Sequence, residues 1–436
     1  MKTVANTANG LAVIGAGWAG CAAAVQAQRL GHDVILFEAS RVAGGRARRV
    51  AVMHNDQTLH LDNGQHILIG AYSETLKLMT DLGIDVDKAL LRMPLTLQFP
   101  DGTGLKLPSL PAPLDALVGI LRARGWSWSD KWWLLKTATM WQLQSFQCAP
   151  QLSVADLCRN ISPRVMTTLI EPLCVSALNT PADRASGQVF LRVLKDSLFA
   201  VSGGSNLLLP RIDLSALLPD AALAWISDRG GQVRLGTRVT QITQQPDKRL
   251  DLLDATGALL GQFDSVILAC PPHEATRLAK TTPAASSDWL ALADGLQYEA
   301  IATVYAHSRS AHLAQPMLAL PSSSTQPAQF VFDRGQLDGP PGLLAFVVSA
   351  SQQGTLEITS QVIAQAAEQL ALTDLTVLQA VVEKRATFAC TPNLERPGAQ
   401  IAPGLLACGD YTQGPYPATL EGAVRSGLHA ASLARH

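Results

Sequence analysis

A glycine-rich turn near the start of the chain places the strongest constraint on its fold. It follows an apolar stretch over 11–14 and has the pattern G-x-G-x-x-G. A small-residue helix over 21–30 and a second apolar stretch over 33–38, which ends on Glu38, come next at the spacing of a dinucleotide-binding βαβ unit. The three glycines of the turn are Gly15, Gly17 and Gly20.

Each position of this unit has a physical role in holding a dinucleotide. Gly15 permits the tight turn, Gly17 lets the backbone approach a pyrophosphate, and Gly20 lets helix and strand pack closely. The helix begins with about half a positive charge facing the phosphates, and Glu38 would accept hydrogen bonds from the ribose hydroxyls of the adenosine. The predicted contacts of this unit are therefore Gly15, Gly17, Trp18, Ala19, Gly20, Glu38 and Ala39.

The first unit cannot by itself distinguish NAD from FAD, but a second glycine turn follows it. Gly44 and Gly45 precede Arg46, so exposed backbone and a cation lie together as a diphosphate requires. Arg48 and Arg49, in the same run, are interpreted as a solvated basic loop. With this Gly-Gly-Arg the chain resembles the superfamily of flavin amine oxidases and phytoene desaturases, which implies FAD as the cofactor and contacts from Gly45 and Arg46.

The far end of the chain supplies the second half of such a site. An apolar stretch over 405–408 ends on Gly409 and Asp410, and a helix is expected from Ala418 onward. The resemblance implies that Gly409 and Asp410 contact the cofactor, with Asp410 at its ribityl or diphosphate portion. It also implies that three backbone amides point at the pyrimidine edge of the flavin, where a helix N-terminus favours the negative charge of the reduced ring: those of Thr419, Leu420 and Glu421. The helix keeps one face small enough to lie close to the sheet or the cofactor, through Gly422, Ser426 and Gly427.

The nucleotide-binding elements are separated along the chain, and 436 residues are too many for one simple core. Between the two half-sites, a helix over 221–231 precedes apolar alternation over 232–235 and 237–242 and a buried strand over 263–270. The resemblance implies that the backbone of Val239 contacts the adenine. We predict an α/β fold, in which a Rossmann-type FAD-binding domain carries an inserted α+β substrate domain with a helical cap. The FAD-binding domain would comprise 9–90, 203–275 and 388–436, and the substrate domain 91–202 and 276–387.

Composition excludes several classes of partner and compartment. A net charge of −1 argues against a nucleic-acid partner. The seven cysteines form no C-x-x-C pair, so we expect reduced thiols in the cytoplasm and neither disulfides nor a metal site. The sequence contains no stretch of about 18 to 20 apolar residues that would span a membrane.

The segment over 61–72 points to the substrate side. It contains Gly64, Gln65 and His66 and resembles the glycine–histidine segment of plant-type phytoene desaturases. The resemblance implies that Gly64 lets backbone pass near the isoalloxazine ring, with Gln65 and His66 beside it. His66 is one catalytic candidate, because an unperturbed histidine titrates near neutrality, although a histidine among apolar residues is more often structural.

Residues 110–145 have an unusual composition, because five tryptophans are interspersed there with arginine and lysine. Two interpretations remain open. In one, the segment lies at the inner face of a membrane, where rings sit among headgroups and cations meet lipid phosphate. In the other, the tryptophans pack a helical cap that begins at Ser129 and Asp130 and turns three side chains inward: Trp133, Met140 and Trp141. The five tryptophans are Trp126, Trp128, Trp132, Trp133 and Trp141.

The middle of the chain narrows the resemblance. Three segments over 171–181, 185–196 and 205–219, together with Asp62–His66, are similar to the hydroxysqualene dehydroxylase family, also called the squalene-associated FAD-dependent desaturases. The similarity runs nearly end to end. It implies reductive loss of the hydroxyl of hydroxysqualene to give squalene for bacterial hopanoid synthesis, with the other squalene-forming enzymes as partners.

The implied reaction makes chemical demands on the residues around the substrate. The hydroxyl of hydroxysqualene is allylic, so its departure leaves a delocalised cation that reduced flavin can quench with a hydride. The protein must protonate the leaving hydroxyl and surround the cation with apolar walls, which suits a charged fraction of only 16%. The candidate acids are His66, Tyr416 and Glu171, whose pKa burial would raise. The other interpretations are that Glu171 is a helix-start acid before Pro172 and that Tyr416 only walls the flavin.

Three other functions share these motifs. A carotenoid or phytoene desaturase would remove hydride from its substrate instead of delivering it, and the motifs do not encode the direction. A flavin amine oxidase would place aromatic walls around an amine, a role open to Tyr411 and Tyr416. A flavoprotein without catalysis would bind FAD for stability or escort isoprenoids.

Overall fold

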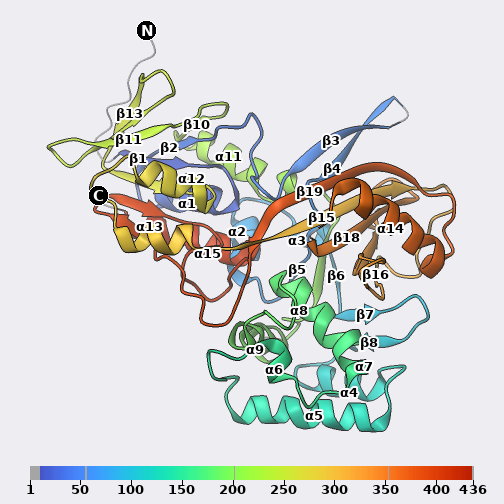
Figure 1. The fold of residues 1–436 in the computed structure, drawn as a ribbon. Helices are drawn as coiled ribbons and strands as arrows, with labels where there is room; N and C mark the ends of the chain where they lie inside the picture. Colours follow the sequence, from blue (N-terminus) through green and yellow to red (C-terminus); the bar gives the residue numbers. More distant parts are fainter. Residues whose placement is uncertain (1–9, 55, 201, 352, 435–436) are drawn as a thin grey trace.

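A mostly parallel sheet of six strands forms one half of the molecule within the described residues, which are 10–434 except 55, 201 and 352 (Figure 1). In this computed structural model the strand order is β10-β2-β1-β14-β21-β20, and only the edge pair β20–β21 is antiparallel among the described strands of the sheet. The predicted Rossmann-type α/β fold is confirmed. The strands are β10 (Gln232–Arg234), β2 (Asp33–Phe37), β1 (Gly10–Ile14), β14 (Ser265–Leu268), β21 (Leu405–Ala407) and β20 (Gln400–Ala402).

The central strands of this sheet are buried on both faces, as parallel strands usually are. In β1, Leu11 and Val13 pack with helix α1 (Trp18–Arg29) and helix α15 (Leu420–Ser432). The alternate residues of the strand join a second apolar cluster, which includes side chains of a three-stranded antiparallel sheet. The strands of that small sheet are β11 (Gln241–Gln244), β12 (Leu250–Leu253) and β13 (Leu259–Phe263).

Helices α1 and α15 lie in close contact, although they come from opposite ends of the chain (Figure 1). A Cβ atom on Gly427 would lie 2.1 Å from the carbonyl oxygen of Ala19, so the helices approach each other more closely than any larger residue permits. The sequence predicted a close approach on this face of α15. At Gly427 the element in close contact is helix α1, which the sequence did not predict.

The sequence located the middle elements of this half, with errors at two boundaries. Strands β10 and β14 lie within the expected ranges, whereas helix α11 (Pro219–Asp228) ends before the predicted end at residue 231. The predicted strand over 237–242 is wrong for its first four residues, because β11 begins only at Gln241. The residues before it form a loop tied to the end of β2, since the Thr237 N–H donates to the carbonyl of Glu38.

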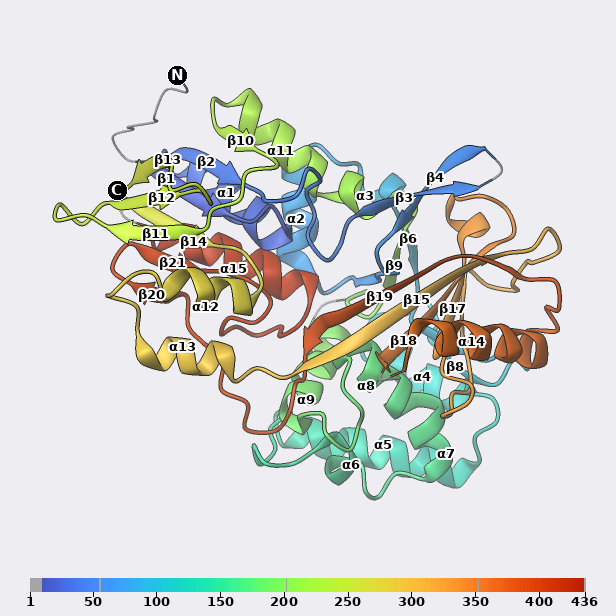
Figure 2. The same cartoon turned by 45° about the horizontal axis from the view of Figure 1, so that its top comes forward.

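The other half is built on a five-stranded antiparallel sheet of order β16-β17-β18-β15-β19. Its long strands β15 and β19 run from the six-stranded half toward the far end of the molecule (Figure 2). Helix α14 (Thr355–Leu370) packs against this sheet through Ile358 and Val362. The strands are β16 (Met317–Ala319), β17 (Phe330–Asp333), β18 (Leu343–Ser351), β15 (Tyr298–His307) and β19 (Thr376–Phe388).

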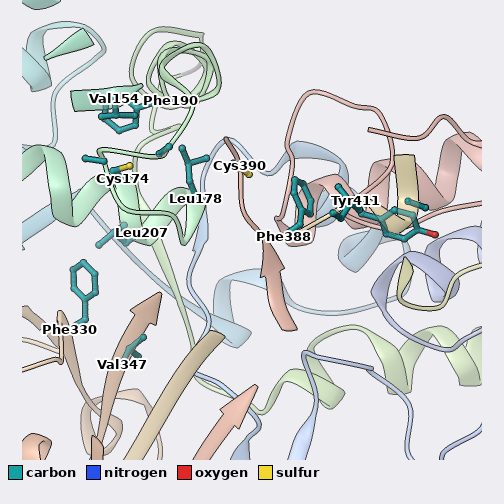
Figure 3. Packing of buried hydrophobic residues seen from close by; sticks show 14 of the residues in the cluster. Val154, Cys174, Leu178, Phe190, Leu207, Phe330, Val347, Phe388, Cys390 and Tyr411 are labelled. Atoms are coloured by element: carbon teal, nitrogen blue, oxygen red, sulfur yellow. The ribbon is translucent and has the colours of Figure 1, made fainter. Parts of the chain in front are cut away.

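A helical cap closes the lower end of the molecule in Figure 1. Two π-helical turns, Met166–Ile170 and Asp196–Ala200, interrupt it, and π turns often occur at functional positions. Figure 3 shows Val154, Cys174, Leu178 and Phe190 of the cap in the apolar cluster that also contains Phe388 and Tyr411 of the carboxyl-terminal part. The cap helices are α4 (Leu114–Arg122), α5 (Trp128–Leu143), α6 (Val154–Leu157), α7 (Pro163–Val165), α8 (Glu171–Leu178) and α9 (Gly187–Lys195).

The predicted start and inward face of α5 need correction. Ser127 caps the helix, because its hydroxyl accepts from the Asp130 N–H while the Asp130 carboxylate accepts from the Ser127 N–H. Trp141 is buried as expected, but Trp133 and Met140 are 41% and 46% exposed. Trp126 and Trp141 pack inside, as the cap interpretation requires, and the other three tryptophans do not. The membrane interpretation stays a prediction.

Arg49 was wrongly interpreted as part of a solvated loop. It begins strand β3 (Arg49–His54), and its guanidinium group pairs with Asp213 at 3.0 Å and Asp220 at 3.1 Å.

The strands of the six-stranded sheet all fall within the ranges assigned to the FAD-binding domain, whose exact boundaries stay a prediction. The remaining elements are β4 (Gln57–Asp62), β5 (Leu68–Ile69), α2 (Ser73–Asp81), α3 (Val86–Ala89), β6 (Leu90–Met93), β7 (Thr96–Gln98), β8 (Gly104–Lys106), β9 (Leu207–Pro210), α10 (Leu214–Leu217), α12 (Pro272–Ala279), α13 (Ser287–Asp294) and a 3₁₀ turn, η3 (Arg334–Leu337).

Candidate active site

A cavity of about 510 Å³ brings together segments from the beginning, middle and end of the chain. Apart from Gly20 and Glu421, every residue predicted to contact the cofactor lines it. Their convergence supports these predictions, while binding itself stays a prediction. The residues are Gly15, Gly17, Trp18, Ala19, Glu38, Ala39, Gly45, Arg46, Gly64, Gln65, His66, Val239, Gly409, Asp410, Thr419 and Leu420.

The glycines of the first turn divide into two that serve the fold and one that faces the cavity. A Cβ on Gly15, whose φ is +111°, would lie 2.7 Å from the carbonyl oxygen of Ala269. A Cβ on Gly20 would lie 1.8 Å from the carbonyl oxygen of Gly15, so Gly20 permits the helix to pack and does not line the cavity. A Cβ on Gly17 would meet nothing closer than the Cα of Gly45 at 4.0 Å, so there is room beside Gly17. The two glycine turns themselves touch, because the Gly44 N–H donates to the Ala16 carbonyl at 2.8 Å.

The Glu38 carboxylate is held at the end of β2 by two backbone groups. One oxygen accepts from the Ala16 N–H and the other from the Ser40 N–H, each at 2.8 Å. A carboxylate oxygen has capacity for a further hydrogen bond. Glu38 is therefore oriented, and still able to accept from a diol at the rim of the cavity.

Replacement of Glu38 by alanine is expected to weaken FAD retention by roughly 1–3 kcal/mol, because charged hydrogen bonds to the ribose are lost. Glu38→Gln is the matched control, since it keeps one acceptor oxygen and should lose less. Titration of each apo-protein with FAD measures the effect. Equal affinity of wild type and Glu38→Ala would remove Glu38 from the ribose site.

Arg46 and Asp410 connect the two half-sites directly. Arg46 Nη2 lies 2.6 Å from Asp410 Oδ1, and Arg46 Nη1 donates to the Ala386 carbonyl. Desolvation disfavours the guanidinium charge, but Asp410 more than offsets it, so the pKa of Arg46 is raised. The sequence assigned each residue separately to the phosphate region, and the structure shows that they also pair with each other.

Thr419 and Leu420 line the cavity at the start of α15, whereas Glu421 does not, and its side chain points toward α2. Thr419 caps the helix by accepting from the Gly422 N–H at 2.9 Å. Glu421 is fully buried, and its carboxylate accepts from the Thr75 hydroxyl, the N–H groups of Glu74 and Thr75, and Arg425. This side chain anchors the N-terminus of α2, a role that sequence reasoning missed.

His66 lies in the cavity as an uncharged group. Desolvation lowers its pKa to about 4, and the positive charge of Arg46 acts in the same direction. Near pH 7 the imidazole can therefore donate or accept a hydrogen bond but is not an imidazolium acid.

The shifted pKa of His66 predicts a pH-dependent stability. Between pH 6.5 and about pH 4 the unfolded chain binds a proton that folded His66 refuses, so the free energy of unfolding falls as pH falls. His66→Gln should lose less stability than wild type between pH 7 and pH 4.5, measured by denaturant unfolding of the apo-proteins. Asp62, whose pKa is raised to about 6, acts in the opposite sense in both proteins, so the comparison cancels it. Identical losses in the two proteins would contradict the assignment.

The other two catalytic candidates do not line this cavity. Glu171 lies on a second hollow of about 850 Å³, where burial and the charge of Asp183 raise its pKa. Val175 lines both spaces, so they are adjacent. The Tyr416 ring lies near two guanidinium groups, of Arg192 and Arg425, outside both linings. His66, Glu171 and Tyr416 are therefore not brought together, and their catalytic roles stay predictions.

An apolar wall faces the cavity from the five-stranded sheet and the cap. The sequence did not identify it, because alternation shows that one face of a strand is buried without showing what that face covers. The wall residues are Leu178, Ile301, Phe330, Phe332 and Val347, from α8, β15, β17 and β18.

Comparison with known proteins is consistent with this arrangement. The family model of flavin containing amine oxidoreductases matches residues 18–434. Hydroxysqualene dehydroxylase of Rhodopseudomonas palustris is 29% identical over 97% of both chains, and that of Sinorhizobium fredii is 27% identical over 97% of both. Zeta-carotene desaturase of Zea mays is 25% identical over 60% of this chain and 49% of its own length.

Solved structures share the fold at low sequence identity. An oxidoreductase from Methanosarcina mazei superimposes with a TM-score of 0.73 at 17% identity, covering 97% of this chain and 99% of that chain. Putrescine oxidase bound to putrescine gives a TM-score of 0.67 at 14% identity, covering 97% and 98%.

Proposed function

The chain belongs to the family of flavin containing amine oxidoreductases, and from that premise we propose that this FAD-dependent oxidoreductase converts hydroxysqualene to squalene by reductive dehydroxylation. The apolar wall opposite the glycine turns carries the proposal, because a hydrocarbon substrate needs such a surface beside the cofactor. The full-length similarity to hydroxysqualene dehydroxylases favours this substrate over a carotenoid, since the similarity to zeta-carotene desaturase covers only 60% of the chain.

The cavity residues fit the cofactor that the family uses. The open space beside Gly17 suits a pyrophosphate, Glu38 a ribose, and the N-terminus of α15 the pyrimidine edge of the ring. Bound FAD in its reduced form supplies the hydride that replaces the hydroxyl, which leaves as water once it is protonated.

The chain's own residues would position the substrate, exclude water and deliver the proton. The apolar wall, including Phe330 and Phe332, would shield the allylic cation from water. FAD and a C30 hydrocarbon together are larger than the drug-sized ligands that an ordinary pocket holds. We therefore propose that part of the substrate occupies the second hollow, which adjoins the cofactor cavity. Glu171 is the proposed acid, since the raised pKa of this carboxyl favours its protonated form and it lines that hollow.

We extend the proposal to the location and partners of the protein. All seven cysteines are free thiols, which supports a reducing cytoplasmic compartment. Within the described residues no helix combines the length and apolar character needed to cross a bilayer. Because the proposed substrate is lipid-like, we propose that the enzyme acts at the inner face of the membrane. Its proposed partners there are the other squalene-forming enzymes.

One alternative function retains specific support. The similarity to zeta-carotene desaturase and phytoene desaturases is compatible with an enzyme that removes hydride from an isoprenoid. An amine oxidase has less support, because Tyr411 lines the cavity but Tyr416 does not, so the two rings do not form a paired aromatic wall there.

An anaerobic single-turnover experiment tests the proposed reaction. Photoreduced protein is mixed with hydroxysqualene, the return of oxidised-flavin absorbance is followed, and the hydrocarbon is identified by mass. Stoichiometric squalene is expected. If the reduced protein is inert toward hydroxysqualene while the oxidised protein is bleached by phytoene, the desaturase function is correct instead.

A further inference from the structure

The outer side of the cap exposes an apolar surface formed by two neighbouring helices, here called the α4–α5 face. Helix α4 contributes leucines at helical spacing, and α5 contributes side chains that are 67–76% exposed. The helices contact each other, and Lys131 Nζ donates to the Leu121 carbonyl at 2.8 Å, which fixes their relation. The face comprises Leu114, Leu117, Leu121, Trp128, Trp132 and Leu143.

The exposed charged side chains of the segment that carries the α4–α5 face are all positive. Within residues 110–147 the exposed charged side chains are cationic, those of Arg122, Arg124 and Lys136. The two acids of this segment are withdrawn: Asp115 is buried, and Asp130 is 11% exposed and engaged in the capping box of α5. Cationic groups also lie beside the rings, with Lys136 Nζ 4.6 Å from the centre of the Trp133 ring.

We propose that the α4–α5 face docks on the surface of an anionic lipid bilayer. Exposed tryptophan and leucine favour the boundary between headgroups and acyl chains, and cations next to them meet lipid phosphate. Scattered single apolar residues are ordinary on a protein surface, whereas six exposed large apolar side chains on two contacting helices favour an interaction site. A second copy of the chain would bring like charges of Arg122 and Lys136 close together, so lipid is the better-matched partner.

The position of the face agrees with this partner. Trp126, between the two helices, donates from Nε1 to the Thr168 hydroxyl at 2.9 Å, and Thr168 lines the second hollow. That hollow shares Val175 and Ser349 with the cofactor cavity. Trp126 therefore connects the two helices of the face to a residue that lines the second hollow. The docking itself requires only the surface chemistry and does not rest on the identity of the substrate.

The test uses the FAD-loaded protein and sedimentation with vesicles of phosphatidylcholine, with and without phosphatidylglycerol. Wild type should bind the anionic vesicles, and the double variant Trp128→Ser/Trp132→Ser should bind at least about 10-fold more weakly. Leu356→Ser is the matched control, because Leu356 is 89% exposed on α14 and lies outside the face. Its binding should equal that of wild type. Flavin content and circular dichroism confirm that each variant is folded.

A second pair of substitutions keeps the test valid if the tryptophan variant fails to fold. Arg122→Glu/Lys136→Glu should weaken binding to anionic vesicles and leave the weaker binding to pure phosphatidylcholine unchanged. Equal binding of wild type and both double variants would overturn the proposal. So would a dimer in lipid-free buffer that the tryptophan variant converts to monomer, with no vesicle binding by wild type.

Discussion

The Gly17→Val variant is expected to fold normally and to purify without flavin. The φ of Gly17 is −74°, so valine needs no unusual backbone, and outside its own helix and chain neighbours the nearest heavy atom to the new Cβ is the Cα of Gly45 at 4.0 Å. The valine methyl groups would instead occupy the cavity space beside Gly17, where the pyrophosphate is expected. Affinity for FAD should fall by about 100-fold or more, measured by titration of the apo-protein and by the flavin absorbance of the purified protein.

Gly354→Val is the matched control for this variant. Gly354 also precedes a helix, with a φ of −74° and open space around its Cβ position, but it lies at α14, outside the cavity. Both variants carry the same small loss of helix-capping energy. A Gly17→Val protein that is as yellow as Gly354→Val would contradict the placement of the cofactor.

Glu421→Ala is expected to destabilise the protein strongly. The substitution removes a fully buried carboxylate and leaves the Thr75 hydroxyl, the N–H groups of Glu74 and Thr75, and part of Arg425 without their acceptor. Buried donors that lose a charged partner cost about 1–3 kcal/mol each, so we expect the free energy of unfolding to fall by about 3 kcal/mol or more. Denaturant unfolding of the apo-protein measures the loss without a contribution from bound FAD.

Glu357→Ala provides the comparison for this effect. Glu357 lies in the first turn of α14, as Glu421 lies in the first turn of α15, but its side chain is exposed to solvent. Its removal should change the free energy of unfolding by less than about 0.5 kcal/mol. Similar losses in the two variants would show that the hydrogen bonds of Glu421 do not stabilise the junction between α15 and α2.

The cofactor half of the site could be predicted from the sequence because its rules are local. A tight turn needs glycine, a helix N-terminus favours phosphate, and Gly-Gly-Arg forms a second turn, all within about 40 residues of one another. Asp410 and Thr419 were identified by the resemblance to flavin amine oxidases and phytoene desaturases, and the fold brings them to the same cavity as Gly15 and Glu38.

The rest of the site depends on contacts that a single sequence does not specify. The pairing of Arg46 with Asp410 and the burial of Glu421 join residues more than 340 positions apart. Hydrophobic spacing predicted helix α5 but did not show which of its tryptophans face solvent, because its apolar residues surround the helix. Glu171 illustrates the same limit, since its place on a neighbouring hollow follows from the packing of α8 and not from its motif.

The location of bound FAD tests the central claim most directly. An experimental structure of the purified yellow protein should show one FAD per chain, with its ribose at Glu38, its pyrophosphate beside Gly17 and its ring between Gly64 and the first turn of α15. Flavin density away from these three points would contradict the account, because distant segments would then not form one site.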